Sequence, residues 1–320
     1  MKTTITSTIT LLFWTTPVLA SEGIAVTNNP TVERAKILYM QRKPEISVLE
    51  EAAKTGDTES QFFFAETLRE DAKYMTREAQ RWYESAANQG DYYSMFRLAT
   101  SSNEICKILK TCPNVKRLEW KNALLSSAKI AANKGNAEAM AILYNITGNL
   151  SWLQRSADAG YPPAQFLLAH RYREGNAFFW PGQREKEEIR LIKASAKQFY
   201  PRAMLEYSTI LQHRGEYEEA WHWLREAAST GYAEAIMEYA LTLKDGMPIG
   251  KNQDTIKAYG LLSLLLSLDG GGGLDDLAKF SLKGLSKNLS PRHISDATLF
   301  AKQWQNSHPP LSYFRVKLEF

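Results

Sequence analysis

Five histidines are the first side chains to consider for chemistry in this 320-residue sequence, because imidazole titrates near neutral pH and is the commonest metal ligand. A helical zinc site needs two histidines one turn apart with a glutamate beside the first, and no H-E-x-x-H occurs. His213 and His222 are nine residues apart, off any single metal-binding face. The sequence therefore predicts no metal site, and surface positions for His170, His213, His222, His293 and His308.

Adjacent glutamates and possible nucleophiles are the next candidates. Paired carboxylates serve acid–base catalysis, but on helices of this composition we expect solvated faces. There is no G-x-S-x-G nucleophile elbow, and no G-x-x-x-x-G-K-[ST] or G-x-G-x-x-G phosphate loop. The glycine run at 270–273 precedes two aspartates, which repel phosphate. We predict no enzymatic activity and no cofactor. The glutamate pairs are Glu50-Glu51, Glu187-Glu188 and Glu218-Glu219.

Cys106 and Cys112 are the two cysteines of the chain, in the spacing C-x5-C. In an oxidising compartment two thiols this close in sequence usually pair. The alternatives are two buried small residues, or a metal pair, which the lack of a nearby histidine disfavours. We expect a disulfide, which closes a short loop and contributes about 2 kcal/mol.

The N-terminus predicts export. Lys2 precedes a threonine-rich apolar segment, and Val18-Leu19-Ala20 supplies small residues suited to a signal-peptidase site. We expect a signal peptide at 1–20, cleaved after Ala20, and a periplasmic or secreted mature protein. An uncleaved anchor is the alternative, but the segment is short and polar for a bilayer span of about 20 apolar residues. We expect no stable membrane insertion. The formal charge of +4, with basic and acidic residues interspersed, predicts no nucleic-acid partner.

One sequence frame recurs along the chain, and its fixed point is a glycine. Around Gly231 the sequence A-W-H-W-L-R-E-A-A-S-T-G-Y-A-E-A reads as a helix, a turn and a second helix. In every copy an alanine lies three residues before this origin and a serine or alanine four residues after it. Successive origins are 25 to 45 residues apart, which is typical of stacked helical repeats. The origins are Gly56, Gly90, Gly135, Gly160, Phe199 and Gly231, so the fifth copy has lost its glycine.

The pattern A-x-x-W-[YL]-x-x-[AS]-A-x-x-G-x-x-x-[AS], followed by K-D-G-x-P-x-G-x-x-x-D, resembles Sel1-like repeats, which are relatives of the tetratricopeptide repeats. Residues 220–254 carry it best, and it covers about two thirds of the chain. The resemblance implies an all-α, right-handed superhelical solenoid of antiparallel helix pairs. We expect a flexible leader at 21–29, the solenoid with capping helices at 30–305, and a tail at 306–320. The tail alternates partly, as an extended segment does, and the sequence leaves it unplaced.

The helix after each glycine is expected to line the concave side of the superhelix, so its outward residues are candidates for partner contact. Charges of both signs alternate there, which favours a protein partner. A loop with three consecutive aromatics either plugs the groove of the superhelix or forms an exposed anchor, since aromatics dominate interface hot spots. Each candidate is also compatible with a solvated surface. The candidates are Glu66, Arg69, Tyr93, Arg97, Arg171, Arg173, Phe178, Phe179, Trp180, Glu206 and Glu238.

The predicted function is therefore binding: a non-enzymatic exported scaffold that engages a protein partner through its concave face. The resemblance implies one specific role, because signal-bearing Sel1-like proteins include periplasmic immunity proteins that neutralise antibacterial lipase effectors. An adaptor in envelope assembly or signalling is the alternative. A binder or hydrolase of cell-wall material is a third hypothesis, which the resemblance to cysteine-rich relatives suggests.

Overall fold

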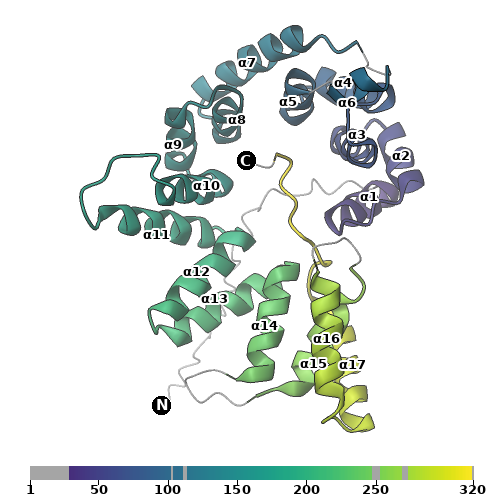
Figure 1. Cartoon of the computed structure of the whole chain (residues 1–320), viewed down its shortest axis with the longest axis vertical. Helices are drawn as coiled ribbons and strands as arrows, with labels where there is room; N and C mark the ends of the chain where they lie inside the picture. Colours follow the sequence, from purple (N-terminus) through teal and green to yellow (C-terminus); the bar gives the residue numbers. More distant parts are fainter. Residues whose placement is uncertain (1–28, 102–103, 111–113, 247–252, 269–272, 319–320) are drawn as a thin grey trace, which may run out of the picture.

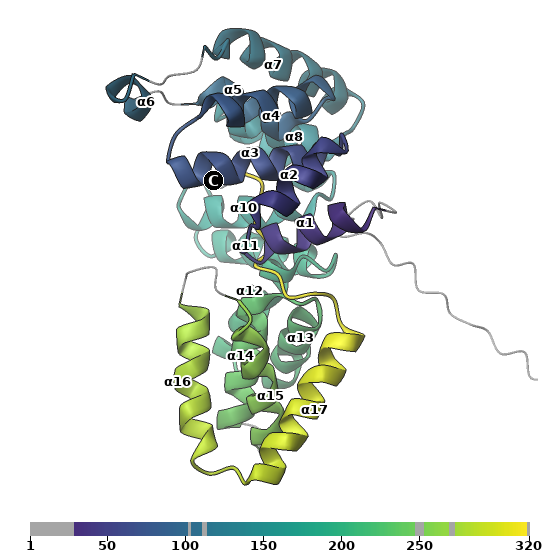
Figure 2. The ribbon, with the colours of Figure 1, turned by 90° about the vertical axis from the view of Figure 1, so that its right-hand side faces the viewer.

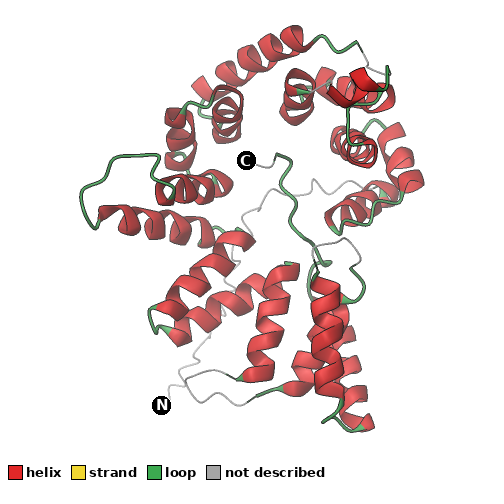
Figure 3. Cartoon of the chain, viewed as in Figure 1, coloured by secondary structure: helices red, strands yellow, loops and turns green. Residues whose placement is uncertain are grey.

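The computed structural model describes residues 29–101, 104–110, 114–246, 253–268 and 273–318. The expected signal peptide, the leader up to residue 28 and Cys112 lie outside these ranges. Figure 3 shows that helices make up almost all of the described chain. The all-α prediction is confirmed.

Seventeen helices form the described part of the protein. They are α1 (Pro30–Met40), α2 (Ile46–Lys54), α3 (Thr58–Ala72), α4 (Arg77–Asn88), α5 (Tyr92–Thr100), α6 (Glu104–Ile108), α7 (Arg117–Asn133), α8 (Ala137–Thr147), α9 (Leu150–Asp158), α10 (Pro162–Arg173), α11 (Gln183–Ala196), α12 (Pro201–His213), α13 (Tyr217–Ser229), α14 (Ala233–Asp245), α15 (Thr255–Leu265), α16 (Leu274–Ser286) and α17 (Pro291–Ser307). Most helices adjacent in sequence pack against each other, except that α7 packs on α5 and α17 on α15.

The helices follow one another around a curved path, as expected for a solenoid (Figure 1). Helices α1 to α10 form an arc that encloses an interior space, and α11 to α17 continue from one end of the arc. The view at right angles in Figure 2 shows the same order, with α15 between α16 and α17. The chain after α17 turns back into the space enclosed by the arc.

All six repeat origins lie in the turn between the two helices of a pair. Each has a left-handed backbone, with φ of +85° to +95° at the five glycines and +59° at Phe199. Glycine adopts this conformation without steric cost. The alanine before each turn and the small residue after it are at most 3% exposed, so they allow the close helix approach that the sequence predicted. These residues are Ala53, Ala87, Ala132, Ala157, Ala196 and Ala228, then Ser60, Ser94, Ala139, Ala164, Ala203 and Ala235.

The residue after each turn differs between the two parts of the solenoid. In the first three repeats it is an Asp or Asn that caps the next helix, accepting a hydrogen bond from the backbone N–H three residues on. In the next three repeats it is a tyrosine without a side-chain capping bond. The six residues are Asp57, Asp91 and Asn136, then Tyr161, Tyr200 and Tyr232.

The apolar residues form two buried clusters along the solenoid, one in α1 to α8 and one from α9 onward. The consecutive Phe62, Phe63 and Phe64 belong to the first cluster, and all three are buried. Phe63 stacks on Tyr39 of α1, while Phe64 contacts Trp82 of α4 edge to face. The three rings therefore fill the space between neighbouring helix pairs.

Candidate functional site

The segment Pro309–Leu318, here called the tail, crosses the interior of the superhelix. It leaves α17 and pairs with the turn before α14, where the N–H of Ser312 donates to Gly231 O and Ser312 O accepts from the N–H of Ala233, both at 2.9 Å. The N–H of Tyr313 then donates to Met40 O at the end of α1. The tail thus connects the turn before α14 to the C-terminal end of α1.

Gly231 is required where the tail crosses. A Cβ atom at this position would lie 2.5 Å from Pro310 O and 3.0 Å from Pro309 O. Its φ of +85° also lies in the left-handed region. At Gly56, Gly90, Gly135 and Gly160 a Cβ would meet nothing within 4 Å. Gly231 therefore serves both the turn and the approach of the tail.

The basic side chains of the tail face α1, α3 and α5. Arg315 Nη2 lies 2.7 and 2.8 Å from the two carboxylate oxygens of Glu70, and its guanidinium stands over the ring of Tyr39 at 4.1 Å. Lys317 Nζ lies 2.9 Å from Glu59 Oε1 and 4.9 Å from the ring centre of Tyr93. These pairs combine charge attraction with cation–π contact. They attach the tail to the first part of the solenoid.

Glu59 connects the tail to α1, because its second oxygen lies 3.0 Å from Nζ of the buried Lys36. Burial by itself raises the pKa of Glu59, but the positive charges of Lys317 and Lys36 outweigh it, so the pKa lies below its ordinary value. The carboxylate is therefore charged at neutral pH and holds both ammonium groups.

A buried charged cluster lies beside the tail. Glu66 is 1% exposed and accepts hydrogen bonds from Tyr83 Oη at 2.7 Å, from Arg69 Nη2 at 2.6 Å and from Arg97. Burial, together with the Glu66 carboxylate, raises the pKa of Tyr83 well above 10. Arg97 also donates to Lys317 O at 3.4 Å. The sequence analysis placed Glu66 on the outward side of its helix, and this was wrong, because its helix turns the carboxylate toward α4 and α5.

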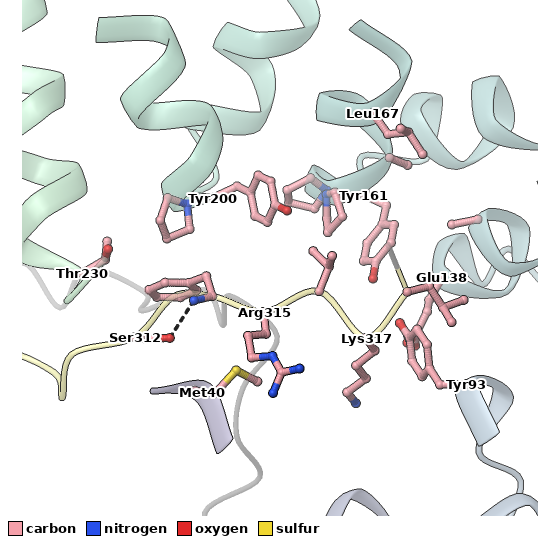
Figure 4. A pocket seen from close by; sticks show the side chains of 18 of the residues that line it. Met40, Tyr93, Glu138, Tyr161, Leu167, Tyr200, Thr230, Ser312, Arg315 and Lys317 are labelled. Atoms are coloured by element: carbon pink, nitrogen blue, oxygen red, sulfur yellow. Dashed lines mark hydrogen bonds between the residues drawn. The ribbon is translucent and has the colours of Figure 1, made fainter. Parts of the chain in front are cut away.

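An open groove of about 810 Å³ lies around the tail, and its charged lining residues are Lys36, Glu59, Glu138, Arg315 and Lys317. Figure 4 shows Tyr161, Tyr200 and Leu167 across from the tail, while Arg315 and Lys317 point the other way. Tyr93 Oη donates to Glu138 Oε1 at 2.6 Å and so joins α5 to α8 at one end of the groove. Apolar and aromatic side chains make up most of the lining, namely Ile142, Leu153, Tyr161, Leu167, Phe199, Tyr200, Phe314 and Val316, with several prolines.

A second charged cluster braces α10 against its neighbours. Arg173 pairs with Glu188 of α11 and with Glu206 of α12, and His170 Nε2 lies 2.9 Å from the other Glu206 oxygen. Burial raises the pKa of Glu206, but its bonds to His170 and Arg173 outweigh burial and bring the pKa below its ordinary value. Arg171 donates to Tyr144 Oη at 2.8 Å. The structure thus brings together two of the candidate contact residues, Arg173 and Glu206, and both also hold the helices in place.

The remaining candidates lie apart. Phe178 and Trp180 are 83% and 68% exposed and contact each other edge to face on the loop between α10 and α11. Phe179 packs on Tyr172. Of the two alternatives for this loop, the groove plug is therefore wrong for Phe178 and Trp180, because both are exposed and the loop projects away from the arc (Figure 1). Glu238 is exposed on α14.

Cys106 is buried in the short helix α6, and Cys112 lies outside the described residues. The disulfide between them stays a prediction. The mass of the alkylated protein with and without prior reduction tests it.

The sequence analysis missed the residues that hold the tail. Tyr39, Glu59, Glu70, Arg315 and Lys317 were not among its candidates. Two signals were present in the sequence. Phe314-Arg315-Val316-Lys317-Leu318 alternates apolar and basic residues, as an extended segment with two different faces does. The change from Asp or Asn to Tyr after the turn was also visible.

No group of three or more His, Cys, Asp or Glu side chains within the described ranges is arranged to hold a metal ion. Among the helices described, none has the length and apolar character needed to cross a membrane.

The fold is similar to solved structures of Sel1-like repeat proteins. A protective antigen of uropathogenic Escherichia coli, which displays an SLR fold, superposes with a TM-score of 0.50 at 18% identity. The match covers 88% of this chain and 62% of the antigen, so this chain spans less than two thirds of that protein. The likeness shows that the chain has the fold of such a repeat solenoid.

Two further solved structures are more distant. A Sel1 repeat protein from Oxalobacter formigenes gives a TM-score of 0.38 at 15% identity, over 79% of this chain and 99% of that one. An immunity protein from Pseudomonas aeruginosa gives 0.40 at 14% identity, over 80% and 91%. No protein-family model and no curated protein matches the sequence.

Proposed function

We propose that this Sel1-like repeat solenoid is a non-enzymatic, exported scaffold that binds one protein partner inside its superhelix. The tail is the observation that carries the proposal. The interior holds this extended segment through the Arg315–Glu70 and Lys317–Glu59 ion pairs, through rings beneath both cations, and through Leu318, which is 2% exposed. The apolar groove of about 810 Å³ beside the tail has the size and lining of a binding site.

Export belongs to the same proposal and rests on the N-terminal sequence. Cleavage after Ala20 yields a mature protein that begins at Ser21 and resides in the periplasm or outside the cell. Cell fractionation, with the mass of the purified N-terminal peptide, tests this step. A chain that keeps residues 1–20 and sediments with membranes contradicts it.

The more specific role that we propose is immunity against an antibacterial lipase effector in the periplasm. It is supported by the sequence resemblance to Sel1-like repeats, a family that includes such proteins. The alternative role is an adaptor in envelope assembly or signalling. Both roles use the same interior surface and differ in the partner.

The experiment is a pull-down from envelope extract with the tagged mature protein as bait and an unrelated exported protein as control bait. Mass spectrometry identifies what is retained. A single stoichiometric partner that kills cells when produced alone in the periplasm, and fails to kill when this protein is present, supports immunity. Recovery of an envelope assembly supports the adaptor role, and a bait that retains nothing contradicts the binding function.

A further inference from the structure

Two phenylalanines that line the groove have a left-handed backbone. The φ angle is +59° at Phe199 and +44° at Phe314. Such angles are uncommon for residues other than glycine, and for a bulky side chain they are genuine outliers. Strained backbone of this kind concentrates at functional sites, where the surrounding structure holds it in place. Two of the five non-glycine residues with positive φ in the described chain line this one groove, which directs attention to it.

Phe199 occupies the turn position that is glycine in the other five repeats. The turn itself needs only a left-handed residue, which glycine provides without strain. At Gly56, Gly90, Gly135 and Gly160 the space where a side chain would begin is open. Phe199 thus adds backbone strain and leaves its side chain 55% exposed. The fold gains little from this ring, so its role is contact with something outside the chain.

The residues around Phe199 determine which kind of partner group the groove can bind. Tyr161 and Tyr200 line the groove with Phe199, and the tail contributes Phe314 and Val316 to the same lining. The basic residues of the tail, Arg315 and Lys317, belong to the groove lining but are paired with Glu70 and Glu59, so the tail offers no unpaired charge to a partner. Burial of a charged partner group there would be costly, whereas burial of apolar groups is favourable.

The backbone of the tail favours an extended occupant. In the part of the chain that the structure describes, no hydrogen bond engages the backbone N–H or C=O of Arg315 or Val316. An extended peptide can pair with such groups, as in strand addition to an exposed edge. The groove is continuous with the contact between the tail and the solenoid, so such a segment would lie alongside the tail.

We propose that the groove takes an extended, apolar segment of a protein partner, with Phe199 as its anchor contact and the backbone at 315–316 as its pairing edge. This inference rests on the proposed binding function and specifies its site and the chemistry of the partner. Figure 4 shows the two walls between which the segment would lie.

The test uses Phe199→Gly, which removes the ring and restores the residue of the other repeats. The probe is a phage-displayed library of random dodecapeptides panned on the full mature protein. We expect enrichment of uncharged peptides rich in apolar residues, at least tenfold weaker binding of them to F199G, and a melting temperature that is unchanged or higher. Phe280→Ala, which removes a 78% exposed phenylalanine on α16, is the matched control and should bind like the wild type.

Three outcomes overturn the proposal. These are no enrichment or enrichment of charged peptides on the wild type, equal binding to F199G, and a lowered melting temperature of F199G, which would give the ring a structural role. The envelope pull-down separates the two proposals. A partner retained equally by wild type and F199G leaves the binding function in place and removes this site, whereas no retained partner contradicts the binding function itself.

Discussion

The first and second parts of the solenoid build the same turn and then place different chemistry beside it. In α1 to α8, an Asp or Asn after the turn caps the next helix, and the interior wall carries carboxylates and buried cations. From α9 onward, a tyrosine takes that place, and the wall of the groove is mostly apolar. The two parts of the interior thus differ in chemistry while the turn and the helix pair stay the same.

The tail is matched to both walls. Its basic side chains, Arg315 and Lys317, contact the charged first part, while Phe314 and Val316 line the groove toward the second. A strand sends alternate side chains to opposite sides, so a short extended segment can satisfy two different surfaces. The difference between the walls therefore explains why one side of the tail is firmly bound and the other side is open.

The largest effect is expected where the first part buries its charges. Glu66→Leu leaves Arg69 and Arg97 without their buried carboxylate, and loss of one partner of a buried ion pair costs about 3–5 kcal/mol. Unfolding in urea, followed by circular dichroism, measures the change. Glu238→Gln alters an exposed glutamate in the second part and should stay within about 0.5 kcal/mol. Equal losses of stability in the two variants would contradict the proposed difference between the first and second parts of the solenoid.

The next largest loss of stability is expected at Gly231, where the tail passes the turn before α14. Gly231→Ala combines a left-handed alanine, which costs about 1–2 kcal/mol, with a clash against Pro310 O that must displace the tail. Gly56 has a similar φ of +90°, and a Cβ atom there would meet nothing within 4 Å. Gly56→Ala should therefore lower the free energy of unfolding only by the cost of the left-handed alanine. Denaturant unfolding of both variants gives the difference, and hydrogen exchange at residues 311–318 should rise only in G231A. Identical behaviour would show that the tail is not tightly held at Gly231.

A smaller effect tests the capping residue itself. Asn136 accepts a hydrogen bond from the N–H of Ala139 at 2.7 Å, and Asn136→Ala should cost about 1 kcal/mol. Glu216, at the N-cap of α13, makes no side-chain capping bond, so Glu216→Ala should change stability by less than about 0.5 kcal/mol. Thermal unfolding of the two variants measures this. A larger loss in E216A would contradict the distinction.

The smallest effect is the pH dependence of tail attachment through Glu59. Its pKa is lowered in the folded protein, so the stabilisation is fully present above the ordinary pKa of 4.5 and is lost as pH falls from there through the folded value. Because Lys317 and Glu59 are about a quarter exposed, we expect a contribution of only about 0.5 kcal/mol. Hydrogen exchange in the tail at pH 6 and at pH 3.5, compared with Lys317→Met, measures it. The pH dependence should be weaker in K317M.

The sequence by itself determined the turns, the helix pairs and the small residues at their contacts. These features depend on residues within a few positions of one another, and the same frame occurs six times, from Gly56 to Gly231. The left-handed backbone persisted even where phenylalanine replaced glycine. Turns and helix pairs can be predicted from the sequence because the residues that form a turn and its flanking helices lie within one repeat.

Only the tertiary structure decided where the tail lies and which charged residues are buried. Arg315 and Glu70 are 245 residues apart in sequence, and their contact depends on the small rotation added at every repeat between them. The same accumulated curvature closes the interior around the tail and forms the groove beside it. The sequence of a single repeat does not reveal the curvature that all repeats produce together. Glu66 and Glu238 therefore looked alike in the sequence, although Glu66 is buried and Glu238 is exposed in the fold.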